Sequence, residues 1–211
     1  LQIDGSTDYS GPSQFVDVVY RDKGIYSCLD RKRGRVFTYD HEGNLLYIFG
    51  GLGTQAGTFK LPVAIENVGN DLLVLDATDA KVTYFKETEY GRLINDAVGL
   101  RYDGDEAEAV DLWQRVLYLD ENNELANTGI GKAYLTAGDY EQAMKYLKLG
   151  MARDYYSVAY RRYRNNFLTE NANVYLTVLI VVIVLIVIYN NLKKRGIIVI
   201  KKKKKGDEQN A

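Results

Sequence analysis

The residues able to do acid–base, nucleophilic or metal chemistry are few in this chain and do not cluster. The chain has one histidine, His41, and one cysteine, Cys28, so no two histidines can share a zinc ion. No serine–histidine–aspartate arrangement and no phosphate-cradling motif are present. The glycines Gly50, Gly51 and Gly53 precede no helix and make no dinucleotide site. The sequence therefore predicts a non-enzymatic protein with no catalytic residue, no cofactor and no metal.

The remaining candidates have structural interpretations. His41 follows Asp40 in a predicted hairpin turn, where a solvated histidine is the expectation. Asp30 and Asp76 occupy equivalent positions of a repeat, so we expect their carboxylates to accept turn backbone hydrogen bonds rather than to form an acid pair. Cys28 is predicted to lie buried in a strand, and it can form no internal disulfide.

The repeat covers residues 1–86. Setting residues 1–40 against 47–86, an offset of 46, aligns glycines, aspartates and apolar residues, and it places Val18 and Val19 opposite Ala64 and Ile65. A period of 40 to 50 residues built of short strands is typical of a β-propeller blade. The predicted strands are Val16–Tyr20, Ile25–Leu29, Arg35–Tyr39, Leu45–Phe49, Val63–Glu66, Leu72–Leu75 and Val82–Phe85.

The motifs of this region resemble the NHL-repeat β-propeller family. A strand ends on Asp30, Arg35 follows five residues later, and the glycine-rich residues 49–62 then run into the Phe-x-x-Pro of the second copy at Pro62. The first copy departs from the pattern, with Val16 at the position of Pro62. Leu1 aligns with Tyr47, inside a fourth strand, and two blades cannot close a ring. The resemblance therefore implies a partial propeller that lacks upstream blades.

From Thr88 the apolar period changes from 2 to 3.6. The predicted helices run from caps at Thr88, Asp105, Asn123 or Glu124, and Asp139 to Tyr102, Leu119, Thr136 and Arg153. A second offset, of 34 residues, sets Gly104-Asp105 on Gly138-Asp139, and Ala109 and Trp113 on Ala143 and Leu147. Residues 88–157 thus resemble two tetratricopeptide (TPR) repeats.

The TPR resemblance implies an inner surface that contacts a peptide or protein. The residues that it would expose there are Arg101, Tyr102, Lys132, Leu135 and Thr136. The alternative is that the two repeats only space the strands from a membrane.

A further predicted helix, about Ser157–Thr169, places apolar residues on one stripe and the cations Arg161, Arg162 and Arg164 elsewhere. Residues 158–170 are interpreted as a capping, juxtamembrane helix. Direct contact of its cations with lipid is the alternative.

Residues 171–192 carry no charge, and 22 residues at about 1.5 Å each reach roughly 33 Å, the thickness of the hydrocarbon core of a bilayer. Tyr175 and Tyr189 stand near the two ends, where tyrosine favours the headgroup level. The sequence predicts a transmembrane helix. A buried core segment is the alternative.

Charge divides at this segment. Residues 1–150 carry 15 Lys and Arg against 24 Asp and Glu, whereas residues 151–211 carry 12 against 4. Lys193, Lys194, Arg195 and the run 201–205 follow the span, which predicts a cytoplasmic tail, residues 193–211, and an extracytoplasmic N-terminal part. The acidic N-terminal part argues against a nucleic-acid partner, and the basic tail favours contact with anionic lipid.

Together these patterns predict a multidomain fold class: a partial all-β propeller with NHL-type blades over 1–86, α-helical TPR hairpins over 88–157 and one transmembrane helix. The expected function is a membrane-anchored scaffold or ligand-binding accessory. The order of parts resembles bacterial membrane proteins associated with carbohydrate ABC transport, which implies transporter subunits as partners. The alternatives are a lactonase-like propeller hydrolase or lyase with its site in upstream blades, and a cytosol-facing adaptor of opposite topology.

Overall fold

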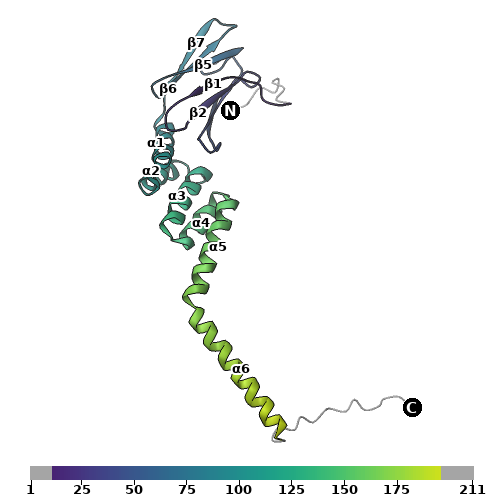
Figure 1. Cartoon of the computed structure of the whole chain (residues 1–211). Coiled ribbons are helices and arrows are strands. Elements are labelled where there is room, and N and C mark those ends of the chain that lie inside the picture. Colours follow the sequence, from purple (N-terminus) through teal and green to yellow (C-terminus); the bar gives the residue numbers. More distant parts are fainter. Residues whose placement is uncertain (1–10, 196–211) are drawn as a thin grey trace, which may run out of the picture. The chain divides into compact units, whose positions relative to one another are not determined.

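Two antiparallel β-sheets and six helices make up the part of the chain that the computed structural model describes, residues 11–195 (Figure 1). The predictions made for residues 1–10 and 196–211 lie outside these described residues. The chain divides into two units, one ending at Tyr160 and one beginning at Arg161. The sheets and the first four helices belong to the first unit.

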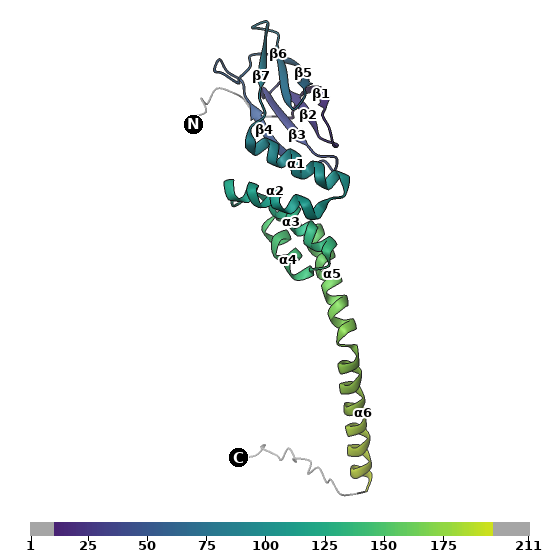
Figure 2. The same ribbon diagram turned by 90° about the vertical axis from the view of Figure 1, so that its left-hand side faces the viewer.

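The first sheet is a four-stranded meander and the second has three strands. The first contains β1 (Phe15–Tyr20), β2 (Tyr26–Asp30), β3 (Arg35–Tyr39) and β4 (Leu45–Gly50) in that spatial order. The second contains β5 (Pro62–Val68), β6 (Asp71–Asp76) and β7 (Lys81–Phe85), with β6 in the middle (Figure 2). All seven strands predicted from the sequence are present, and each end lies within two residues of its prediction.

The two sheets pack against each other through one apolar core. Its fully buried members include Leu29 and Val36 from the first sheet and Val74 from the second, with Phe59 from the connection between the sheets. The Asp17 carboxylate on β1 also accepts a hydrogen bond of 2.8 Å from the backbone N–H of Ile65 on β5. No closed ring of blades is formed by residues 11–195; the observed architecture is two sheets, face to face.

The register confirms the 46-residue repeat in two strands and corrects it in a third. Cys28 pairs with Phe37, and Val74 pairs with Thr83, so each residue of the second pair lies 46 positions after its equivalent in the first. Val18 pairs with Cys28, however, while Ile65 pairs with Val74. The predicted alignment of Val18 with Ala64 is therefore wrong by one residue. The cause is the length of the hairpin: Val18 and its partner Cys28 are ten residues apart, whereas Ile65 and its partner Val74 are nine residues apart.

Asp30 and Asp76 organise equivalent turns, as the repeat predicted. Asp30 Oδ1 accepts backbone hydrogen bonds from Lys32 at 2.9 Å and from Arg33 at 3.2 Å. Asp76 Oδ1 accepts the same two bonds at 2.9 and 3.2 Å, from residues 78 and 79. Burial alone would raise the pKa of Asp76, but backbone hydrogen bonds, first from Lys60 and then from residues 79, 61 and 78, outweigh burial and lower it.

Four helices follow the strands as two hairpins. They are α1 (Glu89–Asp103), α2 (Glu106–Leu119), α3 (Glu124–Ala137) and α4 (Tyr140–Leu149). Thr88 and Asn123 cap α1 and α3 with side-chain hydrogen bonds, as expected from the sequence. Gly104 and Gly138 end the same helices with φ of 94° and 83°, so the turn repeats after 34 residues.

The end of the fourth helix was predicted wrongly. The sequence placed it at Arg153, whereas α4 ends at Leu149 and α5 begins at Arg153 and runs to Glu170. Met151 adopts a left-handed φ of 53° after Gly150, which the continuing apolar period did not reveal. The fifth helix therefore starts four residues earlier than the predicted Ser157.

The second unit contains the end of α5 and the apolar helix α6 (Ala172–Lys194). By length and composition α6 is the one helix among residues 11–195 that could cross a membrane, and none of its side chains is buried. This finding is consistent with a single-pass membrane protein. The predicted flanking residues Arg161, Arg162, Arg164, Tyr175, Tyr189, Lys193, Lys194 and Arg195 are all exposed.

Candidate functional site

The partner-binding residues predicted on the helices divide into two groups in the structure. Lys132 on α3 is buried and Arg101 on α1 is partly buried, and both cations contact the Glu42 carboxylate. The distance from Lys132 Nζ to Glu42 Oε2 is 2.8 Å, and Arg101 Nη1 also lies 3.8 Å from Asp40 Oδ2. Both cations are thus already engaged by the β3–β4 turn, residues 40–44.

The other three residues have different surroundings. Leu135 is buried in the core between α3, α4 and α5. Thr136 is exposed and donates a hydrogen bond to Glu106 on α2. Tyr102 is half exposed, with its ring 5.2 Å from the ring of His41 in an edge-on arrangement. The structure does not bring these three together with Arg101 and Lys132 into one exposed patch, and their contact with a partner stays a prediction.

The turn is held to the helices mainly by charge. Burial alone would raise the pKa of Glu42, but hydrogen bonds from Arg101 and Lys132 outweigh burial and lower it to about 2. The Lys132 ammonium also lies 3.9 Å from the centre of the Tyr155 ring, a favourable cation–π distance. Glu42 therefore ties a hairpin of the first sheet to both helical hairpins.

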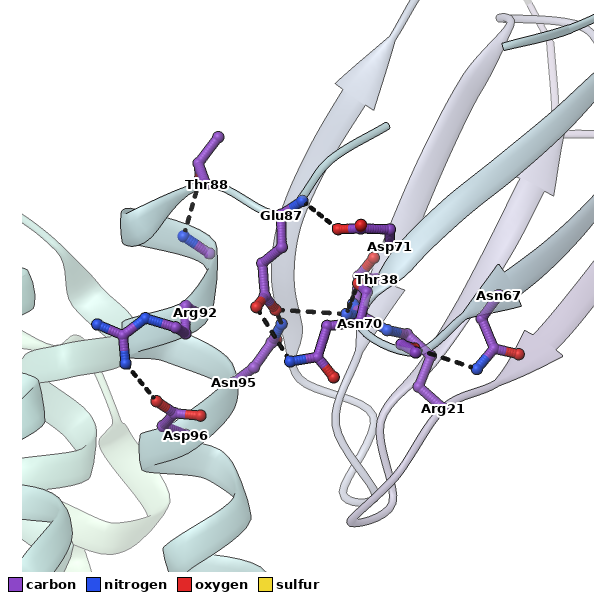
Figure 3. A network of polar contacts seen from close by, with 12 residues as sticks. Arg21, Thr38, Asn67, Asn70, Asp71, Glu87, Thr88, Arg92, Asn95 and Asp96 are labelled. Atoms are coloured by element: carbon purple, nitrogen blue, oxygen red, sulfur yellow. Dashed lines mark hydrogen bonds and ion pairs between the residues drawn. The ribbon is translucent and has the colours of Figure 1, made fainter. Parts of the chain in front are cut away.

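A second polar network joins both sheets to α1, and sequence reasoning missed it. Its centre is the pair of Arg21, in the β1–β2 turn, and Glu87, just before α1, with side chains only 7% and 11% exposed (Figure 3). Asn95 on α1 donates to Glu87 Oε1 at 2.6 Å, and Asn70 in the β5–β6 turn donates to Glu87 Oε2 at 3.2 Å. Arg21 also donates to the Tyr47 hydroxyl at 2.6 Å.

Each member of this network comes from a different turn or element, so no spacing along the sequence links them. One signal was available: Arg21 directly follows an apolar strand, and Glu87 stands between the last strand and the first helix cap. Charged residues at such a junction can face one another across it. The polar groups of the network are hydrogen-bonded to other protein groups. We therefore interpret the network as a structural contact between the sheets and the helices.

Two cavities flank the network and share Arg21, Asn70 and Glu87. The larger, about 630 Å³, is lined by polar and apolar groups in similar measure and lies between the strand turns and α1. The smaller, about 330 Å³, is mostly apolar; Tyr47, Phe49 and Leu72 line it together with further residues of β7 and α1. Both volumes fall in the range of small-ligand pockets.

Metal chemistry has no visible site in the described part of the chain, where no three His, Cys, Asp or Glu side chains gather in a way that could hold an ion. The Cys28 thiol is partly buried, which raises its pKa and makes it a poor nucleophile. No protein-family model matches the chain, and no curated protein matches it.

Proposed function

We propose that the chain is a membrane-anchored, non-enzymatic scaffold or ligand-binding accessory, whose sheet-and-helix unit binds a protein partner outside the cytoplasm. Anchoring is supported by α6, whose apolar side chains leave no soluble face. The orientation rests on the excess of lysine and arginine after the span. Transporter subunits are the partner class that the resemblance suggests.

The observation that carries partner binding is that both sheets expose apolar faces. The strand register places Val18, Tyr20, Tyr26, Cys28, Phe37, Tyr39 and Ile48 on the face of the first sheet that points away from the second. Val18 and Tyr20 are 59% and 62% exposed there, and Val82 and Tyr84 on the second sheet are 58% and 56% exposed. Contiguous apolar surface of this kind marks an interaction site.

The propeller proposal accounts for these faces. One face of the first sheet packs on one face of the second sheet. At the 46-residue offset, the exposed face of the first sheet corresponds to the buried face of the second, and the exposed face of the second corresponds to the buried face of the first. A partner that presents an apolar sheet of the same kind would cover them by the same packing. The α1–α2 and α3–α4 hairpins, with their repeated glycine caps, support the TPR proposal in the same way.

Cross-linking on intact cells tests partner binding. We expect the tagged full-length protein to give a discrete cross-linked protein adduct, and Val82→Asp to lose it because a charge cannot be buried at the interface. Tyr118→Asp is the matched control, since Tyr118 is 88% exposed on α2. Equal adducts from both variants would contradict the assigned face, and no adduct from the unaltered protein would contradict the proposed function.

A further inference from the structure

The second sheet has no counterpart of β4, the fourth strand of the first sheet. In the first sheet β4 pairs with the outer edge of β3, from Arg35 opposite Gly50 to Tyr39 opposite Leu45. β7 is the equivalent of β3 at the 46-residue offset, yet within residues 11–195 it pairs only with β6. One edge of β7 therefore presents backbone N–H and C=O groups without a strand partner in the described structure.

The chain itself departs from the strand pattern at this point. At the same offset β4 corresponds to residues 91–96, which form the first turns of α1. Thr88 accepts a hydrogen bond from the Gly91 N–H at 3.1 Å and so starts a helix where the first repeat starts its fourth strand. The residues that would complete the second sheet are thus used in the helix.

The apolar cavity lies at the C-terminal end of β7, between the two sheets and the start of α1. Phe85, at the end of β7, lines it together with Leu72 of β6, Phe49 of the first sheet and Tyr90 of α1. Phe49 and Phe85 have ring centres 4.9 Å apart, so the floor of the cavity is aromatic. In the first sheet the strand on the equivalent edge contributes Leu-Leu-Tyr-Ile-Phe, residues 45–49, a run of bulky apolar side chains.

We propose that an extended, apolar segment of a protein partner adds to the edge of β7 as an antiparallel fourth strand and places a bulky side chain in this cavity. The inference rests on the proposed partner-binding function and names the partner's chemistry. Main-chain hydrogen bonds to β7 supply affinity, and the cavity supplies selection for an apolar side chain. Lys81 Nζ, at the start of the strand, already lies 3.8 Å from Asp79 Oδ2, whereas the exposed cation Lys86, at its end, favours an acidic residue at the facing end of the segment.

The probe is a fluorescent peptide with the sequence of residues 44–50, Asn-Leu-Leu-Tyr-Ile-Phe-Gly, flanked by glutamates, added to the full-length chain in detergent micelles. We expect the amide hydrogens of residues 81–86 to exchange at least about tenfold more slowly with the peptide bound. A peptide with Pro in place of Ile cannot complete the ladder and should give no protection. Unchanged exchange in residues 81–86 at saturating peptide would overturn the proposal.

Gly91 offers a matched pair of variants at the cavity. A Cβ atom there meets only Thr88 Oγ1 at 3.4 Å and Glu87 Cγ at 3.8 Å, so a side chain is tolerated. Gly91→Trp should fill the cavity and weaken peptide binding at least tenfold, whereas Gly91→Ala should leave it unchanged. Equal binding by Gly91→Trp would contradict the cavity's role.

Two other occupants give distinct outcomes. If a second copy of the chain occupies the edge of β7, the chain should dimerise in the absence of peptide. If residues 1–10 of the same chain occupy it, deleting them should accelerate amide exchange in residues 81–86. Either result would overturn the assignment to a partner strand. If the peptide does not bind but the cell-surface adduct still forms, only the assignment of the β7 edge is refuted. If the adduct itself does not form, the proposed function is refuted.

Discussion

Replacing Glu42 by glutamine tests the contact between the β3–β4 turn and the helices. Glutamine keeps the shape of the side chain but removes its negative charge. Arg101 and Lys132 would then share a buried site whose nearest remaining carboxylate belongs to Asp40, 3.8 Å from Arg101. We expect the Glu42→Gln variant to unfold more easily, because cations left without their partner in a buried site are destabilising.

The magnitude follows from the pKa of Glu42. A fall from an ordinary 4.5 to about 2 corresponds to roughly 3 kcal/mol, at about 1.4 kcal/mol per pKa unit. The side chain is 33% exposed, so solvent screening reduces this figure, and we expect about 1 to 2 kcal/mol. Because the folded pKa is depressed, the stabilisation is complete above pH 4.5 and is lost as the pH falls toward 2.

The assay is urea unfolding of the full-length chain in detergent, followed by the fluorescence of Trp113, which is buried in the core formed with α1. Glu42→Gln should lower the urea midpoint at pH 7, and the gap from the unaltered protein should narrow at pH 3. Glu141→Gln, at an exposed position of α4, is the control and should change neither. A midpoint at pH 7 equal to that of the unaltered protein would refute the reasoning.

Three further substitutions have defined outcomes. Gly131→Ala places a Cβ 2.6 Å from Leu147 Cγ and should cost about 1 to 3 kcal/mol, measured as a lower melting temperature; an unchanged temperature would show that the helices can separate freely. Asp76→Ala removes the acceptor of the Thr78 N–H and should cost about 1 to 3 kcal/mol in urea unfolding, and a neutral result would contradict the turn's role. Val182→Arg places a charge mid-span at a cost of about 2.5 to 3.5 kcal/mol and should release protein into an alkaline carbonate wash; full membrane retention would count against a spanning helix.

Local patterns predicted the strands and the starts of α1 to α4 well, and the reason is visible in particular residues. β3 was predicted with its observed ends because its apolar alternation is bounded by the turns at Gly34 and Gly43, both with positive φ. The start of α1 was predicted because Thr88 is a good N-cap residue and its side chain does cap the helix. These signals lie within a few residues of the feature that they specify.

The errors and omissions involve interactions that sequence spacing does not carry. The one-residue shift of β1 depends on the length of a turn, and the early end of α4 depends on a left-handed Met151. Arg101 and Lys132 were expected to lie exposed on a partner-binding surface, whereas in the structure both contact the Glu42 carboxylate. Their observed carboxylate partner, Glu42, is 90 residues from Lys132, a distance at which no periodicity links two side chains.

The most direct test of a membrane-anchored protein with an external binding region is protease shaving of intact cells. One tag is inserted after Glu121, in the exposed α2–α3 loop, and a second follows Ala211. Loss of the loop tag with retention of the tail tag is the result that our account predicts. Protection of the loop with loss of the tail would contradict it and would place the sheets and helices in the cytosol.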